Sequence, residues 1–316
     1  MQMIQTVLGK IAPQTLGFCH SHEHIMLARG VPFTIDAALC ADDFEKSLQE
    51  LKMFAQVGGG AIVDAQPVGA GRMGKELARL SAQSGVGIVA STGFHRAEFY
   101  GQGHWSFAWS EEELTELFVH EITTGMFEGT EDAPPRDFEG IKAGQIKTAY
   151  TTRGLDAHYT RLFAAAAACC VTTSAPMMIH IDNGMNPIAL DDFLQARGVA
   201  PQKRIYCHLD RAVRDIKIHF KLAARGCYLE YDTIARPKYH DDNAEIAIIQ
   251  QIIDAGHAHS ILLGMDSTSK RLKAYGGSVG LDYIARTFIP AMKSAGLGQK
   301  EIDAFMIDNP ARAFAF

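Results

Sequence analysis

Six side chains of the kind that bind metal ions stand at the ends of short apolar segments that are far apart in this sequence. Residues separated in this way cannot form a local metal knuckle, so only a closed barrel of parallel strands would bring them to one point. The arrangement therefore predicts a barrel whose strand ends share one metal centre. The residues are His22, His24, Lys147, His180, His208 and Asp266.

Apolar runs of strand length alternate with amphipathic segments of helix length along the whole chain, which is typical of a parallel sheet covered by helices. Eight such pairs favour an α/β fold of the (β/α)8 TIM barrel type over an open doubly wound sheet, and no GxGxxG follows the first strand. The predicted strands are Gly17–Ile25, Ala61–Ala65, Val86–Thr92, Gly144–Ala149, Met177–Ile181, Ile205–Leu209, Cys227–Tyr231 and Ile261–Met265. The predicted helices are Asp42–Val57, Gly71–Ser84, Glu111–Thr124, Asp156–Cys170, Pro187–Arg197, Ala212–Ala224, Asn243–Ala255 and Leu281–Ser294.

The 316 residues contain no linker, repeat or low-complexity tract, so we expect a single domain over residues 1–316. The first residues lack the apolar run of a signal peptide, and no stretch is long enough to span a bilayer, so we expect a cytoplasmic protein without a membrane partner. The six cysteines form no CxxC pair and are predicted to be buried thiols. A net charge of −6 argues against nucleic-acid binding and leaves a small-molecule substrate as the expected partner.

The segment HSHEH places two imidazoles on one face of the first strand. Residues two apart on a strand share a face, so His22 and His24 are predicted to point into the barrel while Glu23 points outward. A lone HxH pair, or one buried histidine, is usually structural. The presence of His180, His208 and Asp266, each late in its own strand, favours metal binding instead.

Lys147, in the segment AGQIKTAY, is predicted to place an amine in the barrel interior. A bare ammonium is costly to bury among apolar side chains, so the neutral amine is favoured there. A neutral amine can add CO2, and the resulting carbamate could bridge two divalent cations. A lysine paired with a buried carboxylate and a Schiff-base lysine of a barrel aldolase are the alternatives. The histidines favour the carbamate.

The ordered motifs HSHEH, AGQIK and GMD, the two later histidines and the NPARAF ending resemble the phosphotriesterase family of the amidohydrolase superfamily. The resemblance covers nearly the whole chain and implies a (β/α)8 barrel with two divalent ions and a homodimer. It implies that one ion is held by His22, His24 and Asp266, that a more exposed ion is held by His180 and His208, and that carboxylated Lys147 bridges them. Zinc is expected first, and manganese or cobalt would also suit these mixed ligands.

Hydrolysis is the activity that the resemblance implies. Two cations can activate a shared hydroxide and polarise a carbonyl, and we hypothesise that Asp266 accepts the hydroxide proton and passes it to the leaving oxygen. We expect a lactonase that opens a phosphorylated sugar lactone. A phosphotriesterase or phosphodiesterase using the same site is the alternative. An aldolase forming a Schiff base on Lys147 and a non-catalytic metal-binding protein are less favoured.

Basic residues after the seventh and eighth predicted strands favour a phosphorylated substrate, because barrels often bind phosphate there. Each of them, taken alone, could be an ordinary solvated loop residue. In the sugar-lactone branch an arginine and a tyrosine are expected three and six residues after the metal-binding aspartate, where this chain has Ser269 and Leu272. The predicted substrate-binding residues are His95, Arg236, Lys238, Lys270, Arg271 and Tyr275.

Overall fold

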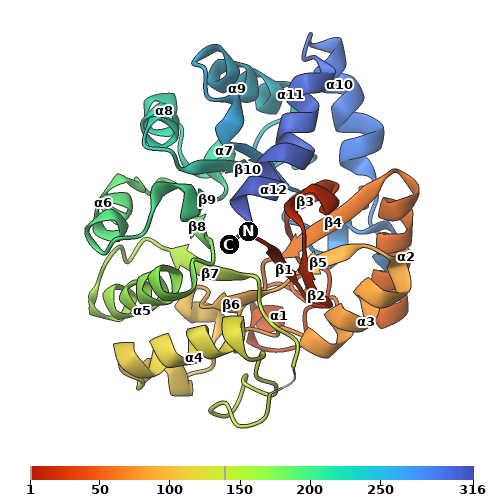
Figure 1. Ribbon diagram of the computed structural model, residues 1–316. Helices are drawn as coiled ribbons and strands as arrows, with labels where there is room; N and C mark the ends of the chain where they lie inside the picture. The colour runs from red at the N-terminus through yellow and green to blue at the C-terminus, as the bar shows by residue number, and fades with distance from the viewer. Residues whose placement is uncertain (1, 139) are drawn as a thin grey trace.

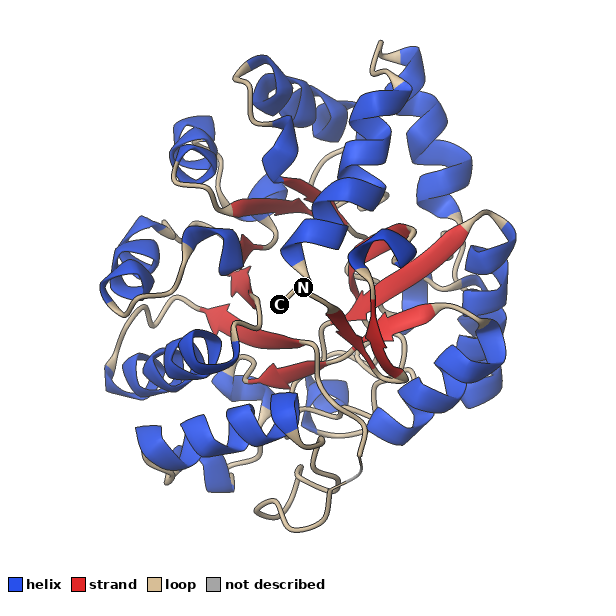
Figure 2. Cartoon of the chain, in the orientation of Figure 1, coloured by secondary structure: helices blue, strands red, loops and turns tan. Residues whose placement is uncertain are grey.

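Parallel strands form the inside of the molecule and helices surround them, as the computed structural model shows (Figures 1 and 2). The structure describes residues 2–138 and 140–316, so Met1 and Glu139 of the expected domain lie outside the described residues. One parallel sheet has the strand order β11-β10-β9-β8-β7-β6, and a second has the order β3-β4-β5. The strands are β3 (Phe18–Glu23), β4 (Gly59–Asp64), β5 (Gly87–Val89), β6 (Ser91–Gly93), β7 (Gln145–Tyr150), β8 (Met177–Ile181), β9 (Arg204–Tyr206), β10 (Tyr228–Tyr231) and β11 (Ile261–Leu263).

The two sheets meet within the third predicted strand, which is interrupted at Ala90. Its first half, β5, pairs with β4, and its second half, β6, pairs with β7. On the other side, no ladder joins β11 to β3 within the described chain. Instead, the N–H groups of Met265 and Asp266 donate to the carbonyl of His22 at 3.3 and 3.0 Å.

The helices follow the strands as the sequence predicts, with ends that differ by a few residues. Several begin at a side chain that accepts a backbone N–H of the first turn, such as Ser110 before α4 and Asp156 before α5. None of the helices in the described part of the chain is long and apolar enough to cross a membrane. The main helices are α1 (Val31–Ile35), α2 (Phe44–Gln56), α3 (Gly74–Ser84), α4 (Glu111–Thr123), α5 (Ala157–Thr173), α6 (Ile188–Ala196), α7 (Leu209–Ala212), α8 (Ile216–Ala224), α9 (Asp242–Asp254), α10 (Ile289–Ser294), α11 (Gln299–Asp303) and α12 (Asn309–Ala313).

Two predicted helices differ from the structure in their organisation. The helix predicted as Ala212–Ala224 begins later, as α8, because Asp215 starts it by accepting the N–H of Lys217, and the short α7 before it overlaps the prediction only at Ala212. The segment Leu281–Ser294 contains a π-helical turn, Ile284–Phe288, before α10. A third element was not predicted at all: the antiparallel hairpin of β1 (Ile4–Thr6) and β2 (Gly9–Ile11).

The chain ends lie side by side near the middle of the ring of strands (Figure 1). Met3 and Phe316 exchange two backbone hydrogen bonds of 3.0 and 2.9 Å, and Phe314 is fully buried. Phe314 packs in one apolar cluster with residues of successive strands, whereas a larger cluster fills the space between strands and helices. Burying this area is the main source of stability and leaves the opposite, carboxyl ends of the strands free for polar groups. The members of the inner cluster from the strands include Cys19, Val63, Val89, Met178, Ile205 and Leu262.

All six cysteines are free thiols, as predicted, and only Cys40 is partly exposed among them.

Candidate metal centre

A bulge in β3 directs His22 and His24, the last two histidines of HSHEH, toward the centre. Three steps along β3, from His20 to Glu23, match only two steps along β4, so the simple alternation of sides is broken there. His22 and His24 consequently lie together, with ring centroids 5.6 Å apart. The position of His22 also requires Gly264 on the neighbouring segment, where a Cβ atom would lie 2.9 Å from the Cβ of His22.

Glu23 is fully buried. Its carboxylate accepts the N–H groups of Met265 and Ser267, both at 3.1 Å, and also contacts the ring of His20. These two N–H groups flank Asp266. Glu23 therefore fixes the segment that presents Asp266, which alternation along an isolated strand could not indicate.

Lys147 lies fully buried on β7, with its amine directed at the histidine pair. Its Nζ atom is 3.0 Å from Nε2 of His22. The neighbouring strand passes very close here, since a Cβ atom at Gly93 would meet the Lys147 carbonyl oxygen, and Gly93 also has a positive φ of 96°. A glycine is needed at this crossing.

His180 and His208 approach each other from β8 and from the turn after β9. Nδ1 of His180 and Nε2 of His208 are 2.8 Å apart. His180 follows the inward face of β8, but His208 does not continue β9: its φ of 61° is left-handed and turns the ring to the centre. Asp266 also has a left-handed backbone, with φ of 46°. Strain of this kind, at two of the predicted ligands, is characteristic of functional sites.

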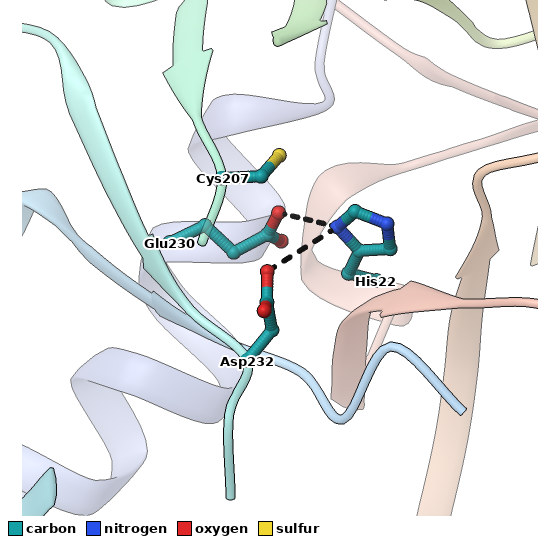
Figure 3. Close-up of side chains that lie close together, drawn as sticks. All are labelled: His22, Cys207, Glu230 and Asp232. Atoms are coloured by element: carbon teal, nitrogen blue, oxygen red, sulfur yellow. Dashed lines mark hydrogen bonds and ion pairs between the residues drawn. The ribbon is translucent and has the colours of Figure 1, made fainter. Parts of the chain in front are cut away.

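Carboxylates hold the ring nitrogens that face away from the centre. Nδ1 of His22 is 2.9 Å from Glu230, Nδ1 of His208 is 2.7 Å from Asp232, and Nε2 of His180 is 2.9 Å from Asp182. Each histidine therefore keeps its other nitrogen available to the interior, the arrangement that outer carboxylates impose on metal-binding histidines. Figure 3 shows Glu230 and Asp232, on and just after β10, both directed at His22, with Cys207 beside them.

The charge states suit ligands. Burial lowers the pKa of His22 and of His208 well below the usual range and lowers that of His180 to about 4, so these rings are neutral near pH 7. Burial alone would raise the pKa of Asp266, but Arg236 and Arg211 hold it well below its usual range. Burial raises the pKa of the Glu230 and Asp232 carboxyls. A cation bound beside these carboxyls would therefore be favoured.

Asp266 connects the histidines to two arginines. Its Oδ1 atom is 3.4 Å from Nε2 of His24 and 3.8 Å from Nε2 of His22. Its Oδ2 atom is 2.9 Å from Arg211 and 3.2 Å from Arg236. All six predicted ligands are thus brought together at one point. Asp266 lies where the histidines meet the cationic wall of a cavity above them, which is formed by Arg211, Arg236, Lys238, Lys270 and Arg271.

That cavity has a volume of about 740 Å³ and opens over the carboxyl ends of the strands. Five of the six predicted substrate-binding residues line it. The ring of His95 lies 5.5 Å from that of His180, and Arg236 contacts Asp266 as described above. The lining side chains among the predicted set are His95, Arg236, Lys238, Lys270 and Arg271.

The basic residues of this wall differ in their contacts. Lys270 is exposed and forms an ion pair of 2.9 Å with Asp36. Arg271 is mostly buried and donates to the carbonyls of Met265 and Ile234, and burial together with Arg236 lowers its pKa to about 10. Arg271 therefore holds the segment before Asp266. Lys238 is exposed, with Nζ 4.7 Å from the ring centroid of Tyr239, and is the most available cation.

Tyr275 is not brought to the cavity, which corrects its assignment to the substrate site. Its hydroxyl lies 2.8 Å from that of Ser47 on α2 and donates to the carbonyl of Asp43. The tyrosine therefore attaches the last loop to α2. Its sequence position near Asp266 could not distinguish a pocket residue from one facing the outer helices.

Sequence reasoning missed Glu230, Asp232 and Arg211. Glu230 lies within the predicted strand Cys227–Tyr231, and an acidic residue inside an otherwise apolar buried strand is a signal that could have revealed it. Asp232 follows the same strand end. Arg211 lies on α7 and pairs with both Asp232 and Asp266, a contact that only the folded chain brings about.

These observations define a class of protein: an α/β barrel whose strand ends carry a buried centre of histidine, lysine and aspartate, open to a cationic cavity. The chain belongs to the phosphotriesterase family, whose model matches residues 2–314. This confirms the predicted family.

Relatives with named activities cover nearly the whole chain. A phospho-furanose lactonase of Mycoplasmopsis synoviae is 27% identical over 99% of this chain and 91% of its own length. The human N-acetyltaurine hydrolase is 28% identical over 99% of this chain and 98% of its own. The structure of the lactonase Lmo2620 from Listeria monocytogenes matches with a TM-score of 0.88 at 29% identity, covering 99% of this chain and 98% of that one. The likeness confirms the TIM barrel fold, and the named relatives are hydrolases.

Proposed function

We propose that this protein is a metal-dependent hydrolase that opens a lactone carrying a phosphate or similar anionic group. The observation that carries the proposal is the meeting of His22, His180 and His208, each with one ring nitrogen held by a carboxylate, beside the buried amine of Lys147. Such a set has little purpose in packing alone, because each buried polar group must be compensated.

The residues fit a pair of divalent cations. Ligand atoms of His22, His24 and Asp266 lie within 4.8 Å of one another, and the free nitrogens of His180 and His208 are directed at each other. His22, His24 and Asp266 would hold one cation, His180 and His208 the other, and Lys147, as a carbamate, would serve both. When bound, two cations lower the pKa of a water molecule and polarise a carbonyl or phosphoryl oxygen. Zinc, manganese and cobalt all suit these ligands.

Asp266 is positioned to handle a proton. Its carboxylate is kept ionised by Arg211 and Arg236, which contact the same oxygen. A proton that it accepts is therefore bound weakly and is readily passed to the leaving oxygen of the substrate. The arginines at the same time keep the cavity wall cationic next to the reacting centre.

The cationic wall supports an anionic substrate. Arg236 and Lys238 lie on the loop after β10, and Arg96 lines the same cavity. The substrates in the names of two relatives share an anionic group: the phosphate of a phosphofuranose lactone and the sulfonate of N-acetyltaurine. They differ in the bond that is hydrolysed. The second name therefore makes an anionic amide the second candidate substrate.

A substrate panel tests the proposal. Protein loaded with zinc or manganese is offered sugar lactones with and without a phosphate, N-acetyltaurine and a phosphotriester, and the hydrolysis products are quantified. We expect the phosphorylated lactones to be preferred and a chelator to abolish turnover. Preference for the triester would move the function to phosphotriester hydrolysis. Unchanged activity after complete metal removal, or borohydride trapping of a substrate on Lys147, would overturn the metal-dependent mechanism.

A further inference from the structure

A second cluster of ligand-type side chains lies beyond the metal centre, on the far side of Arg211. It consists of Asp210 on α7, His240 on the loop before α9, and Glu245 in the first turn of α9. One ligand atom from each residue lies within 4.8 Å of the other two. The cluster shares no residue with the six predicted ligands.

The cluster has an unsatisfied buried acceptor. Glu245 has an exposed fraction of 1%, and its Oε1 atom has no hydrogen-bond partner among the described residues. Its Oε2 atom is 2.5 Å from Nε2 of His240. The two carboxylates face each other, and the charge of Asp210 adds to burial in raising the pKa of Glu245. A buried acceptor opposite a second carboxylate requires a positive partner.

Asp210 is itself held in place. One of its oxygens accepts the N–H groups of Asp232 and Thr233, at 2.9 and 2.6 Å, and the other accepts that of Arg211 at 2.8 Å. These bonds leave the carboxylate with further lone pairs for a ligand on its other side. His240 is partly exposed, and a cavity of about 870 Å³ that both Asp210 and His240 line gives access from solvent.

We propose that Asp210, His240 and Glu245 form a further divalent-cation site, separate from the centre at Lys147. Two carboxylates and one imidazole are a ligand set that suits zinc or manganese. The bound cation would join α7 to α9 and thereby fix the loop between β10 and α9. That loop carries Arg236 and Lys238, so the site would order the cationic wall of the main cavity.

Metal counting tests the site. Full-length protein is saturated with Mn²⁺, freed of excess metal, and its bound metal is measured for the wild type, Glu245→Gln and His240→Gln. We expect each variant to bind one equivalent less than the wild type. The matched controls Glu112→Gln and His259→Gln, both at exposed positions, should keep the full content. Two variants are used because either could be lost to misfolding, and circular dichroism identifies a folded protein.

To distinguish this site from the main centre, the bound metal is also counted in proteins that carry Lys147→Met. The difference of one equivalent between the wild-type and altered cluster should persist there, even if the centre at Lys147 binds nothing. An anomalous difference map of Mn²⁺-loaded crystals should place a peak among the three side chains. Equal metal content in all folded variants, with no peak, would overturn the proposal and leave a shared proton between Asp210 and Glu245.

Discussion

The Nζ atom of Lys147 lies 3.0 Å from Nε2 of His22, whose other ring nitrogen, Nδ1, is bound by Glu230. The contact joins β3 to β7 across the interior, and both residues are fully buried. An amine and an imidazole with no carboxylate between them gain little from each other. The pair therefore indicates a site organised for a ligand that binds to both.

Lys147→Met should remove the anionic ligand that a carbamate would provide. We expect the bound metal and the hydrolytic activity to fall together, because methionine has no amine that could form the carbamate. Lys147→Glu restores a carboxylate and should recover part of the metal content. Metal analysis of both variants, with turnover on the preferred lactone, checks this. Full metal binding by Lys147→Met would contradict a bridging role for the lysine.

Asp266→Ala should abolish turnover but leave the protein folded. Arg211 would keep its contact with Asp232 at 3.3 Å, and Arg236 would keep its hydrogen bond to the backbone carbonyl of residue 266, so both arginines retain a partner. Circular dichroism and thermal unfolding report the fold, and the substrate assay reports activity. An active variant would exclude Asp266 from proton transfer.

Glu230→Ala should weaken the centre without removing a direct ligand. The outer carboxylate sets which nitrogen of His22 faces inward, and loss of such partners costs roughly 10- to 100-fold in metal affinity or activity. Glu230→Gln keeps an acceptor oxygen and should lose less. The exposed Glu112→Gln is the control. Equal metal affinity in Glu230→Ala and the wild type would show that His22 is held by other contacts.

Lys238→Met should raise KM for a phosphorylated lactone by roughly 10- to 100-fold, the loss expected for a charge-assisted hydrogen bond. The KM for an unphosphorylated lactone should not change.

Tyr275→Phe is the informative companion, because it removes a hydroxyl bound to Ser47 and Asp43. It should cost about 1 kcal/mol of stability and leave KM unaltered. A raised KM in Tyr275→Phe would return that residue to the substrate site.

Asp191→Asn should remove a pH-dependent part of the stability. Burial opposes ionisation of this carboxyl, but Arg225, Tyr206 and Arg204 hold its pKa below the usual value of 3.8. The stabilisation is therefore complete above about pH 4 and is lost as pH falls through the lower pKa of the folded state. We expect a difference of about 3 kcal/mol at pH 7 that shrinks below pH 4.

The measurement is urea unfolding of both proteins between pH 7 and pH 3, comparing the free energy of unfolding at each pH. The difference between the proteins isolates Asp191 from the other carboxylates. A difference that does not vary with pH would show that Asp191 acts through packing or neutral hydrogen bonds.

The barrel could be predicted because burial and side-chain period are recorded locally in the sequence. The strand Met177–Ile181 was predicted with the same ends that β8 has, and alternation along it places His180 on the same side as Met178 of the inner cluster. The third strand could not be predicted as two pieces, since its break depends on which neighbour each half pairs with. The hairpin of β1 and β2 is short and was overlooked for that reason.

The identity of the candidate ligands was decided by the sequence, and their direction by the tertiary structure. Cys207 faces the barrel interior, so alternation alone would turn the next residue, His208, outward. The left-handed backbone of His208 brings its ring to the centre instead, and the N–H group of His208 donates to Asp232. The bulge beside Glu23 depends in the same way on a neighbouring strand. Local sequence records chemistry and burial, whereas bulges, strained turns and outer carboxylates arise from hydrogen bonds between segments distant in the chain.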